Sequence, residues 1–222
     1  MKVLLIGGLG YLGSHILNAL RERGFAVTIA TRHPFAPAMV RVDLLDPRTF
    51  EAVDDFDIIV NASDGLMAPP DDLIAHCLEH GLTFIETSSD PETTERLTDR
   101  FHGRHDSKGV LVLGAGIFTG LSNLVAAHAV NLASAGQDGS TTEGDGVDGV
   151  EKLELGIRVS PLSRGGQGMV KLIPHLLALE TVRFEHGERV ASQGIEKGPR
   201  LRFISGTHGN LSLPLAEPPM LH

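Results

Sequence analysis

Residues 7–13 read GGLGYLG and follow directly on a short apolar run, residues 3–6. The next residues carry apolar side chains at helical spacing, so the glycines lie between a predicted strand and a predicted helix. Gly7 permits a tight turn, Gly10 lets a ligand approach the backbone, and Gly13 lets the helix pack closely on the strand. A pyrophosphate group would bind the backbone amides at the positive end of that helix. The segment predicts a dinucleotide-binding turn, and a purely structural glycine-rich turn is the alternative.

Short apolar runs and helical patterns alternate along the first 134 residues. The patterns predict strands over 3–6, 26–30, 39–42, 57–61, 83–86 and 110–113, and helices over 11–23, 71–80, 91–107 and 121–133. Such alternation is typical of a doubly wound parallel sheet, because each helix returns the chain to the start of the next strand. The sequence therefore predicts an α/β fold with an N-terminal Rossmann domain over residues 1–134.

The composition changes after this region. Residues 135–149 are rich in Gly, Ser, Thr and Asp, which predicts a flexible linker. Beyond it, the patterns predict a half-exposed strand over 150–160, a helix over 169–180, and antiparallel strands over 181–185, 189–191 and 201–204. We therefore expect a second, smaller α+β domain over residues 150–222.

Charge and cysteine content limit the possible partners and location. The formal net charge is −9, so binding to a nucleic-acid backbone is not expected. Cys77 is the only cysteine, which excludes an internal disulfide and a cysteine-based zinc site. No apolar stretch is long enough for a membrane helix, and the short run before Gly7 does not fit a signal peptide. We expect a cytoplasmic protein with no membrane partner and a small-molecule substrate.

The residues after the second predicted strand bear on the choice of cofactor. NAD-binding domains usually place an acidic residue there to bind the ribose hydroxyls, whereas this chain has Thr31 and Arg32. Arg32 can pair with a 2′-phosphate, and Thr31 can donate a hydrogen bond to the same group. The alternative is a solvated arginine in a loop. We therefore expect NADP(H), with NAD as the second choice.

Residues at the carboxyl ends of parallel strands face a common ligand crevice. Asp43 follows the third strand and is expected near the adenine, while Asn61, Ala62 and Ser63 follow the fourth strand and are expected to line the crevice. The complete set of expected cofactor-binding residues is Gly7, Gly10, Tyr11, Leu12, Gly13, Thr31, Arg32, Asp43, Asn61, Ala62 and Ser63.

Candidates for substrate chemistry are few. The only tyrosine, Tyr11, lies inside the glycine motif, which excludes a Tyr-x-x-x-Lys dehydrogenase mechanism because that mechanism needs a tyrosine further along. Ser88 follows the fifth strand and is a candidate for polarising a substrate, with a helix cap as the alternative. Arg164 is a candidate for binding a substrate carboxylate, with a flexible connection as the alternative. We interpret His76 and His80 as part of a solvated helix face and expect no metal site.

Three segments resemble the saccharopine dehydrogenase-like family, which includes saccharopine reductases and trans-acting enoyl reductases. They are VLLIGGLGYLGSHI (3–16), GVLVLGAGIFTGLSNLVA (109–126) and VSPLSRGGQGMV (159–170). The resemblance implies a Rossmann domain followed by a mixed α+β substrate domain, with the motif glycines binding pyrophosphate and Arg32 the cofactor phosphate. Glu86 is a departure, because such proteins often have an Asp there. Family members usually continue through a larger second domain, so we expect a partial one here.

Two functions remain open from these observations. The first is an NADP(H)-dependent oxidoreductase that transfers a hydride to or from a small imine, carbonyl or enoyl substrate. The second is a non-catalytic NAD(P)-binding sensor or interaction protein. In either case the region after residue 150 is too small to cover its own apolar face, so we expect a homodimer formed through it.

Overall fold

The computed structural model describes residues 1–63, 68–104, 107–116, 119–138, 153, 155–156, 174–175, 178–185, 188–193, 197–198 and 200–211. Its first elements are β1 (Lys2–Ile6), α1 (Tyr11–Glu22), β2 (Ala26–Thr31), β3 (Met39–Arg41), the 3-10 helix η1 (Pro47–Val53), β4 (Ile58–Asn61), α2 (Asp71–Glu79), β5 (Thr83–Glu86), α3 (Pro91–Phe101) and β6 (Val110–Val112). Further along the chain are α4 (Leu121–Asp138), β7 (Glu180–Glu185), β8 (Glu188–Gln193), β9 (Leu201–Phe203) and β10 (Gly206–His208).

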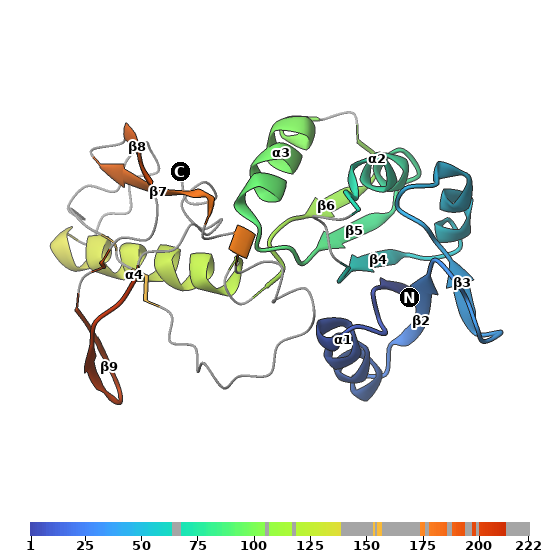
Figure 1. The fold of residues 1–222 in the computed structure, drawn as a ribbon, viewed down its shortest axis with the longest axis horizontal. Helices are drawn as coiled ribbons and strands as arrows, with labels where there is room; N and C mark the ends of the chain where they lie inside the picture. Colours follow the sequence, from blue (N-terminus) through green and yellow to red (C-terminus); the bar gives the residue numbers. More distant parts are fainter. Residues whose placement is uncertain are drawn as a thin grey trace.

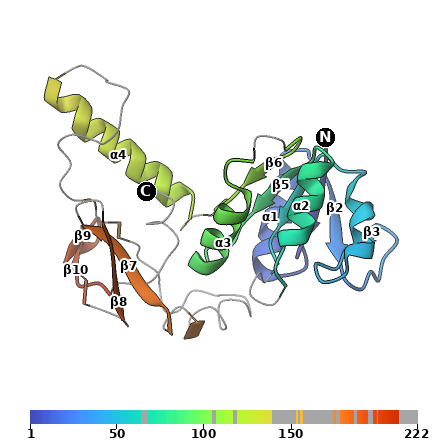
Figure 2. The same ribbon diagram turned by 90° about the horizontal axis from the view of Figure 1, so that it is seen from above.

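Six parallel strands form one sheet in the order β3-β2-β1-β4-β5-β6. The helix α1 lies on one face of this sheet, and α2 and α3 lie on the other (Figures 1 and 2). The strand order reverses between β1 and β4, which is where open α/β sheets bind ligands. The predicted Rossmann-type α/β fold is therefore confirmed.

Burial on both faces explains why the central strands are continuously apolar. In β1, Val3 and Leu5 pack with Leu17 of α1 in one core cluster. Leu4 and Ile6 point to the opposite face, where the second cluster includes apolar residues of α2 and α3. Both faces of β1 thus contact helices, and Leu4 and Leu5 are fully buried.

Local signals set most helix ends. Asp90 caps α3 because its Oδ2 accepts a hydrogen bond from the Thr93 amide at 2.8 Å, and Pro91 takes the first helical position. The predicted end of this helix at residue 107 was wrong. The helix ends at Phe101, because the backbone of His102 is extended and Gly103 adopts a positive φ of 71°.

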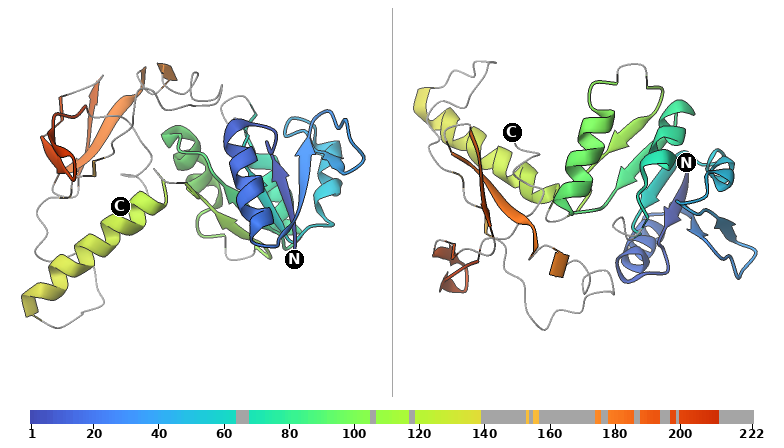
Figure 3. Two further views of the ribbon diagram at one scale, coloured as in Figure 1. Left: turned by 90° about the horizontal axis from the view of Figure 1, so that it is seen from below. Right: turned by 45° about the horizontal axis from the view of Figure 1, so that its top comes forward.

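The chain leaves the sheet after β6. Helix α4 runs away from the six strands instead of covering the edge of the sheet, as the views in Figures 1 and 3 show. Apolar side chains on α4 and β6 are consequently exposed, among them Leu124, Leu132 and Val110. Among the described residues, no helix is long and apolar enough to cross a membrane.

The second region contains two antiparallel hairpins, β7 with β8 and β9 with β10. These confirm the predicted antiparallel strands, although the sequence did not predict β10. The predicted strand over 150–160 is not formed at residues 153 and 155–156, which have no regular structure. The helix predicted over 121–133 continues to Asp138, so residues 135–138 of the predicted linker are helical. The rest of the linker and most of the predicted helix over 169–180 lie outside the described residues, so the domain boundaries stay a prediction.

Candidate functional site

The glycine motif forms the connection from β1 to α1. Gly7 has a positive φ of 75°, and a Cβ placed there would lie 2.6 Å from the carbonyl oxygen of Ala62. A Cβ on Gly13 would overlap the carbonyl oxygen of Gly7, so α1 packs against the turn only with glycine at this position. A Cβ on Gly10 would meet only the Gly7 oxygen, at 3.2 Å. Gly7 and Gly13 therefore serve the fold, while Gly10 is exposed and no side chain covers its backbone.

The start of α1 is open to an anion. Gly10 is the N-cap, and no described side chain bonds to the amides of the first turn, which also has no acidic residue. By contrast, Asp90 caps α3. Free amides and the positive end of the helix dipole favour a negatively charged group at the start of α1. Tyr11 and Leu12 lie beside these amides and are about half exposed, at 48% and 51%.

Hydrogen bonds join the loops at the carboxyl edge of the sheet. The Ala62 amide donates to the Ile6 carbonyl at 3.0 Å, which joins the loop after β4 to the end of β1. The Thr87 hydroxyl donates to the Asn61 carbonyl at 2.8 Å, and the Ala115 amide donates to the Glu86 carbonyl at 2.9 Å. The loops that follow β4, β5 and β6 thus form one connected wall beside the glycine turn.

Glu86 is the buried charge behind this wall, with only 2% of its surface exposed. Its Oε2 accepts a hydrogen bond from Asn61 Nδ2 at 2.7 Å, and its Oε1 accepts one from the Ser88 amide at 2.8 Å. Burial raises the pKa of Glu86 to about 7, although these hydrogen bonds lower it. Glu86 therefore fixes the positions of the loops after β4 and β5 and exchanges a proton near neutral pH.

Asn61 and Ser63 belong to the same network. The Asn61 side chain is fully buried, and its Oδ1 accepts hydrogen bonds from the Ser63 amide at 3.2 Å and the Ser63 hydroxyl at 2.7 Å. Asn61 therefore shapes the crevice loop from behind, whereas Ala62 and Ser63 are partly exposed.

Thr31 ends β2, Arg32 follows it, and Asp43 follows β3, so all three lie at the same edge of the sheet. Arg32 is exposed, and its guanidinium has no hydrogen-bond or salt-bridge partner within the part of the chain that the structure describes. Thr31 Oγ1 accepts a hydrogen bond from the His33 amide at 3.4 Å. Asp43 is half-buried, and its Oδ1 accepts one from the Leu45 amide at 3.1 Å. Arg32 can therefore turn toward a ligand without breaking an existing ion pair.

Of the two residues predicted to contact a substrate, Ser88 and Arg164, the structure describes only Ser88. Ser88 follows β5 at the crevice edge, and its Oγ accepts a hydrogen bond from the Asp90 amide at 3.2 Å. This bond belongs to the turn before α3, whose cap is Asp90, and the hydroxyl proton of Ser88 can still be donated. Arg164 lies outside the described residues.

His175 is a site residue that sequence reasoning missed. Its Nε2 lies 3.2 Å from Asp90 Oδ1 and 3.6 Å from Glu92 Oε2, at the start of α3. Asp90 is buried, whereas 28% of the His175 side chain is exposed. A histidine held by a buried carboxylate can carry a proton to or from a bound molecule. Because Asp90 and His175 are 85 positions apart, no local sequence signal pairs them.

Comparison with known families gives one match. Residues 3–93 match the family model described as the NAD dependent epimerase/dehydratase family. This segment extends from β1 into α3 and contains the glycine turn, Arg32 and Glu86. No curated protein matches the chain. The matching model is not that of the saccharopine dehydrogenase-like family, so that resemblance stays a hypothesis.

Several solved structures are similar to part of the chain at low identity. MoeE5 in complex with UDP-glucose and NAD is 19% identical over 51% of this chain and 53% of that one, with a TM-score of 0.40. A short-chain dehydrogenase/reductase superfamily protein from Agrobacterium tumefaciens with bound NAD is 18% identical over 51% and 48%, with a TM-score of 0.41. The UDP-glucose 4-epimerase of Thermus thermophilus in complex with NAD is 24% identical over 40% and 38%, with a TM-score of 0.32. The chain spans about half or less of the length of these proteins.

Proposed function

We propose that this chain binds a nicotinamide dinucleotide at the carboxyl edge of its sheet, with NADP(H) preferred over NAD(H). The observation that carries the proposal is the uncapped start of α1, beside a Gly10 backbone that no side chain covers. The match of residues 3–93 to an NAD-dependent family supports the binding of a nicotinamide dinucleotide independently of the geometry, but not the preference for NADP(H).

The residues present fit such a ligand. The amides of Tyr11, Leu12 and Gly13 would bind the pyrophosphate, because they belong to the first turn of α1. Ala62 and Ser63 would contact the ligand along the wall formed by the loop after β4. Glu86 would hold this loop in place, with Asn61 as its hydrogen-bond partner.

The preference for NADP(H) depends on Arg32. Its exposed guanidinium is free to pair with a 2′-phosphate, and Thr31 precedes it at the end of β2. The Oδ1 of Asp43 already accepts a hydrogen bond from the Leu45 amide. We therefore assign Asp43 to the adenine end of the site and not to the phosphate.

We propose oxidoreductase activity as the reaction class. A bound nicotinamide would supply hydride transfer, and a small imine, carbonyl or enoyl compound of the saccharopine dehydrogenase-like type would be the substrate. Ser88 would polarise the substrate, Arg164 would bind its carboxylate, and His175 with Asp90 would hold the exchanged proton. A homodimer, which we expect to form through the region after residue 150, would also cover the apolar surface exposed on α4.

A sensor or interaction protein without turnover is the second candidate. Two observations favour it, because both leave few groups for acid–base chemistry. At the described part of the crevice, Glu86 is buried and both of its carboxyl oxygens accept hydrogen bonds. The only tyrosine, Tyr11, lies in the glycine turn. Steady-state turnover of NADPH with a panel of keto acids and amines separates the two functions. Turnover supports the oxidoreductase, whereas tight NADPH binding without turnover supports the sensor.

Binding itself is tested by changing Gly10. In Gly10→Ala, the new methyl group meets only the Gly7 oxygen and projects into the space assigned to the pyrophosphate, so we expect a normal fold with weakened NADPH binding. Gly209→Ala is the matched control, because nothing lies within 4 Å of its Cβ position. Fluorescence titration with NADPH gives the affinities. Equal affinity of both variants and the wild type would contradict the proposed site.

A further inference from the structure

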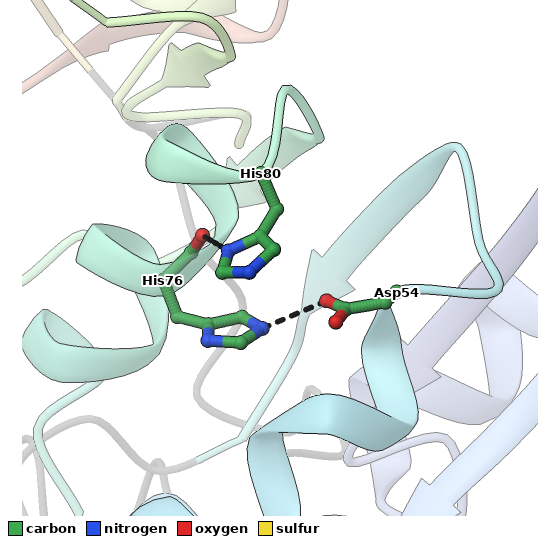
Figure 4. Close-up of side chains that lie close together, drawn as sticks. All are labelled: Asp54, His76 and His80. Atoms are coloured by element: carbon green, nitrogen blue, oxygen red, sulfur yellow. Dashed lines mark hydrogen bonds and ion pairs between the residues drawn. The ribbon is translucent and has the colours of Figure 1, made fainter.

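Three side chains of the kinds that bind metal ions lie close together, away from the glycine turn. This cluster consists of Asp54, which follows η1, and of His76 and His80 on and just after α2, as Figure 4 shows. One ligand atom from each of the three residues lies within 4.8 Å of the other two. The sequence pattern predicted a solvated helix face for the histidines, but only 17% of the His76 side chain is exposed because Asp54 and Phe50 contact it.

The hydrogen bonds within the cluster orient its nitrogen atoms. The Nδ1 of His80 lies 2.8 Å from the carbonyl oxygen of His76, so this nitrogen carries the proton and Nε2 keeps its lone pair. The Nε2 of His76 donates to Asp54 Oδ1 at 2.7 Å, so a metal ion would replace the proton between these two atoms. Metal-binding histidines are commonly fixed as His80 is, with one ring nitrogen donating to a carbonyl while the other is left to bind the metal.

The two histidines lie one helical turn apart and face each other. Their rings stack with centroids 4.0 Å apart and planes 20° apart, so one ring must rotate before a nitrogen of each can point at one ion. Histidines at this spacing on a helix can bind one metal ion together. Ligand atoms of a tetrahedral zinc site lie about 3.4 Å apart for bonds of about 2.05 Å, so the three ligand atoms, which now lie within 4.8 Å of one another, would move closer by side-chain rotation. Three ligands then leave a fourth position for water.

The cluster is at the opposite edge of the sheet from the crevice. His80 precedes β5, and Asp54 precedes β4, so both lie where these strands begin. The glycine turn, by contrast, lies where β1 ends. A metal ion here would join η1 to α2, two segments whose ligands are 22 positions apart, and would not touch a ligand in the crevice.

We infer that Asp54, His76 and His80 form a binding site for a divalent transition-metal ion of the zinc type. Imidazole and carboxylate together suit Zn²⁺, whereas Mg²⁺ and Ca²⁺ prefer oxygen ligands alone. The site is structural, because it lies outside the crevice and links two segments of the fold. This inference is independent of the proposed function.

Isothermal titration of the full chain with ZnCl₂ tests the inference. We expect one Zn²⁺ per chain, with affinity reduced roughly tenfold or more in His80→Gln and in Asp54→Asn, because loss of a residue that only orients a ligand already costs 10–100-fold. His102→Gln is the control, since His102 is an exposed histidine at the end of α3. It should bind Zn²⁺ as the wild type does.

The outcomes are distinguishable even if one variant folds poorly. His80 and Asp54 are exposed, and circular dichroism checks that each variant is folded. Zinc should also raise the Tm of the wild type and not that of His80→Gln. No zinc binding by the wild type, or equal binding by wild type and His80→Gln, would overturn the site.

Discussion

Replacement of the buried Glu86 by glutamine changes how stability depends on pH. The unfolded chain has an ordinary carboxyl pKa near 4.5, whereas burial raises the folded pKa to about 7. Between these values the folded state holds a proton that the unfolded state has lost. The folded state is therefore most favoured below the unfolded pKa, and the free energy of unfolding falls as pH rises through the folded pKa.

The size of the effect follows from the pKa difference. A difference of about 2.5 units corresponds to about 3 kcal/mol, lost between about pH 4.5 and about pH 8. Glutamine does not titrate, so Glu86→Gln should lack this loss. Its amide group replaces one acceptor oxygen, which leaves either Asn61 Nδ2 or the Ser88 amide without a partner and costs about 1–3 kcal/mol at low pH. The variant should be less stable than the wild type at pH 4.5 and should regain about 3 kcal/mol relative to it by pH 8.

Urea unfolding followed by circular dichroism measures this difference, since the chain has no tryptophan for fluorescence. Glu51→Gln is the control, because Glu51 is exposed on η1 and should show the pH dependence of the wild type. If the difference between Glu86→Gln and the wild type stays constant from pH 4.5 to 8, the carboxyl group is not held protonated in the folded chain and the reasoning fails.

Three further results are expected. Gly13→Ala should lower the free energy of unfolding by about 2 kcal/mol or more, since its Cβ overlaps the Gly7 carbonyl, and an unchanged urea midpoint would argue against that contact. Asp90→Ala should cost about 1 kcal/mol through loss of the cap on Thr93, measured in the same assay. The exposed apolar residues of α4, such as Leu124, should be covered in a homodimer, so light scattering at micromolar concentration should give twice the chain mass; a monomer mass would rule the dimer out.

The sheet and the glycine turn could be predicted because their signals are local. Each strand is a short apolar run, and the spacing of Gly7, Gly10 and Gly13 determines the turn. The bounds of α1, α2 and the strands of the sheet agree with the prediction to within a residue. The end of α3 was missed because Gly103 was not recognised as the residue that stops the helix, and η1 was missed because a 3-10 turn has no strong periodic pattern.

The partners of charged residues could not be predicted, because they come from distant positions. Glu86 pairs with Asn61, 25 residues earlier, and nothing in either segment reveals that the carboxyl group is buried. The proposed metal site needs Asp54 beside His76 and His80. The packing of η1 on α2 brings these residues together, although they are far apart in the sequence.

Titration of the wild type and Arg32→Ala with NADPH and with NADH tests the central claim most directly. The account predicts that NADPH binds the wild type more tightly than NADH, and that Arg32→Ala removes this preference while NADH binding stays unchanged, because the exposed Arg32 holds no other contact among the described residues. Failure of the wild type to bind either nucleotide would contradict the account and would leave the glycine turn a purely structural feature.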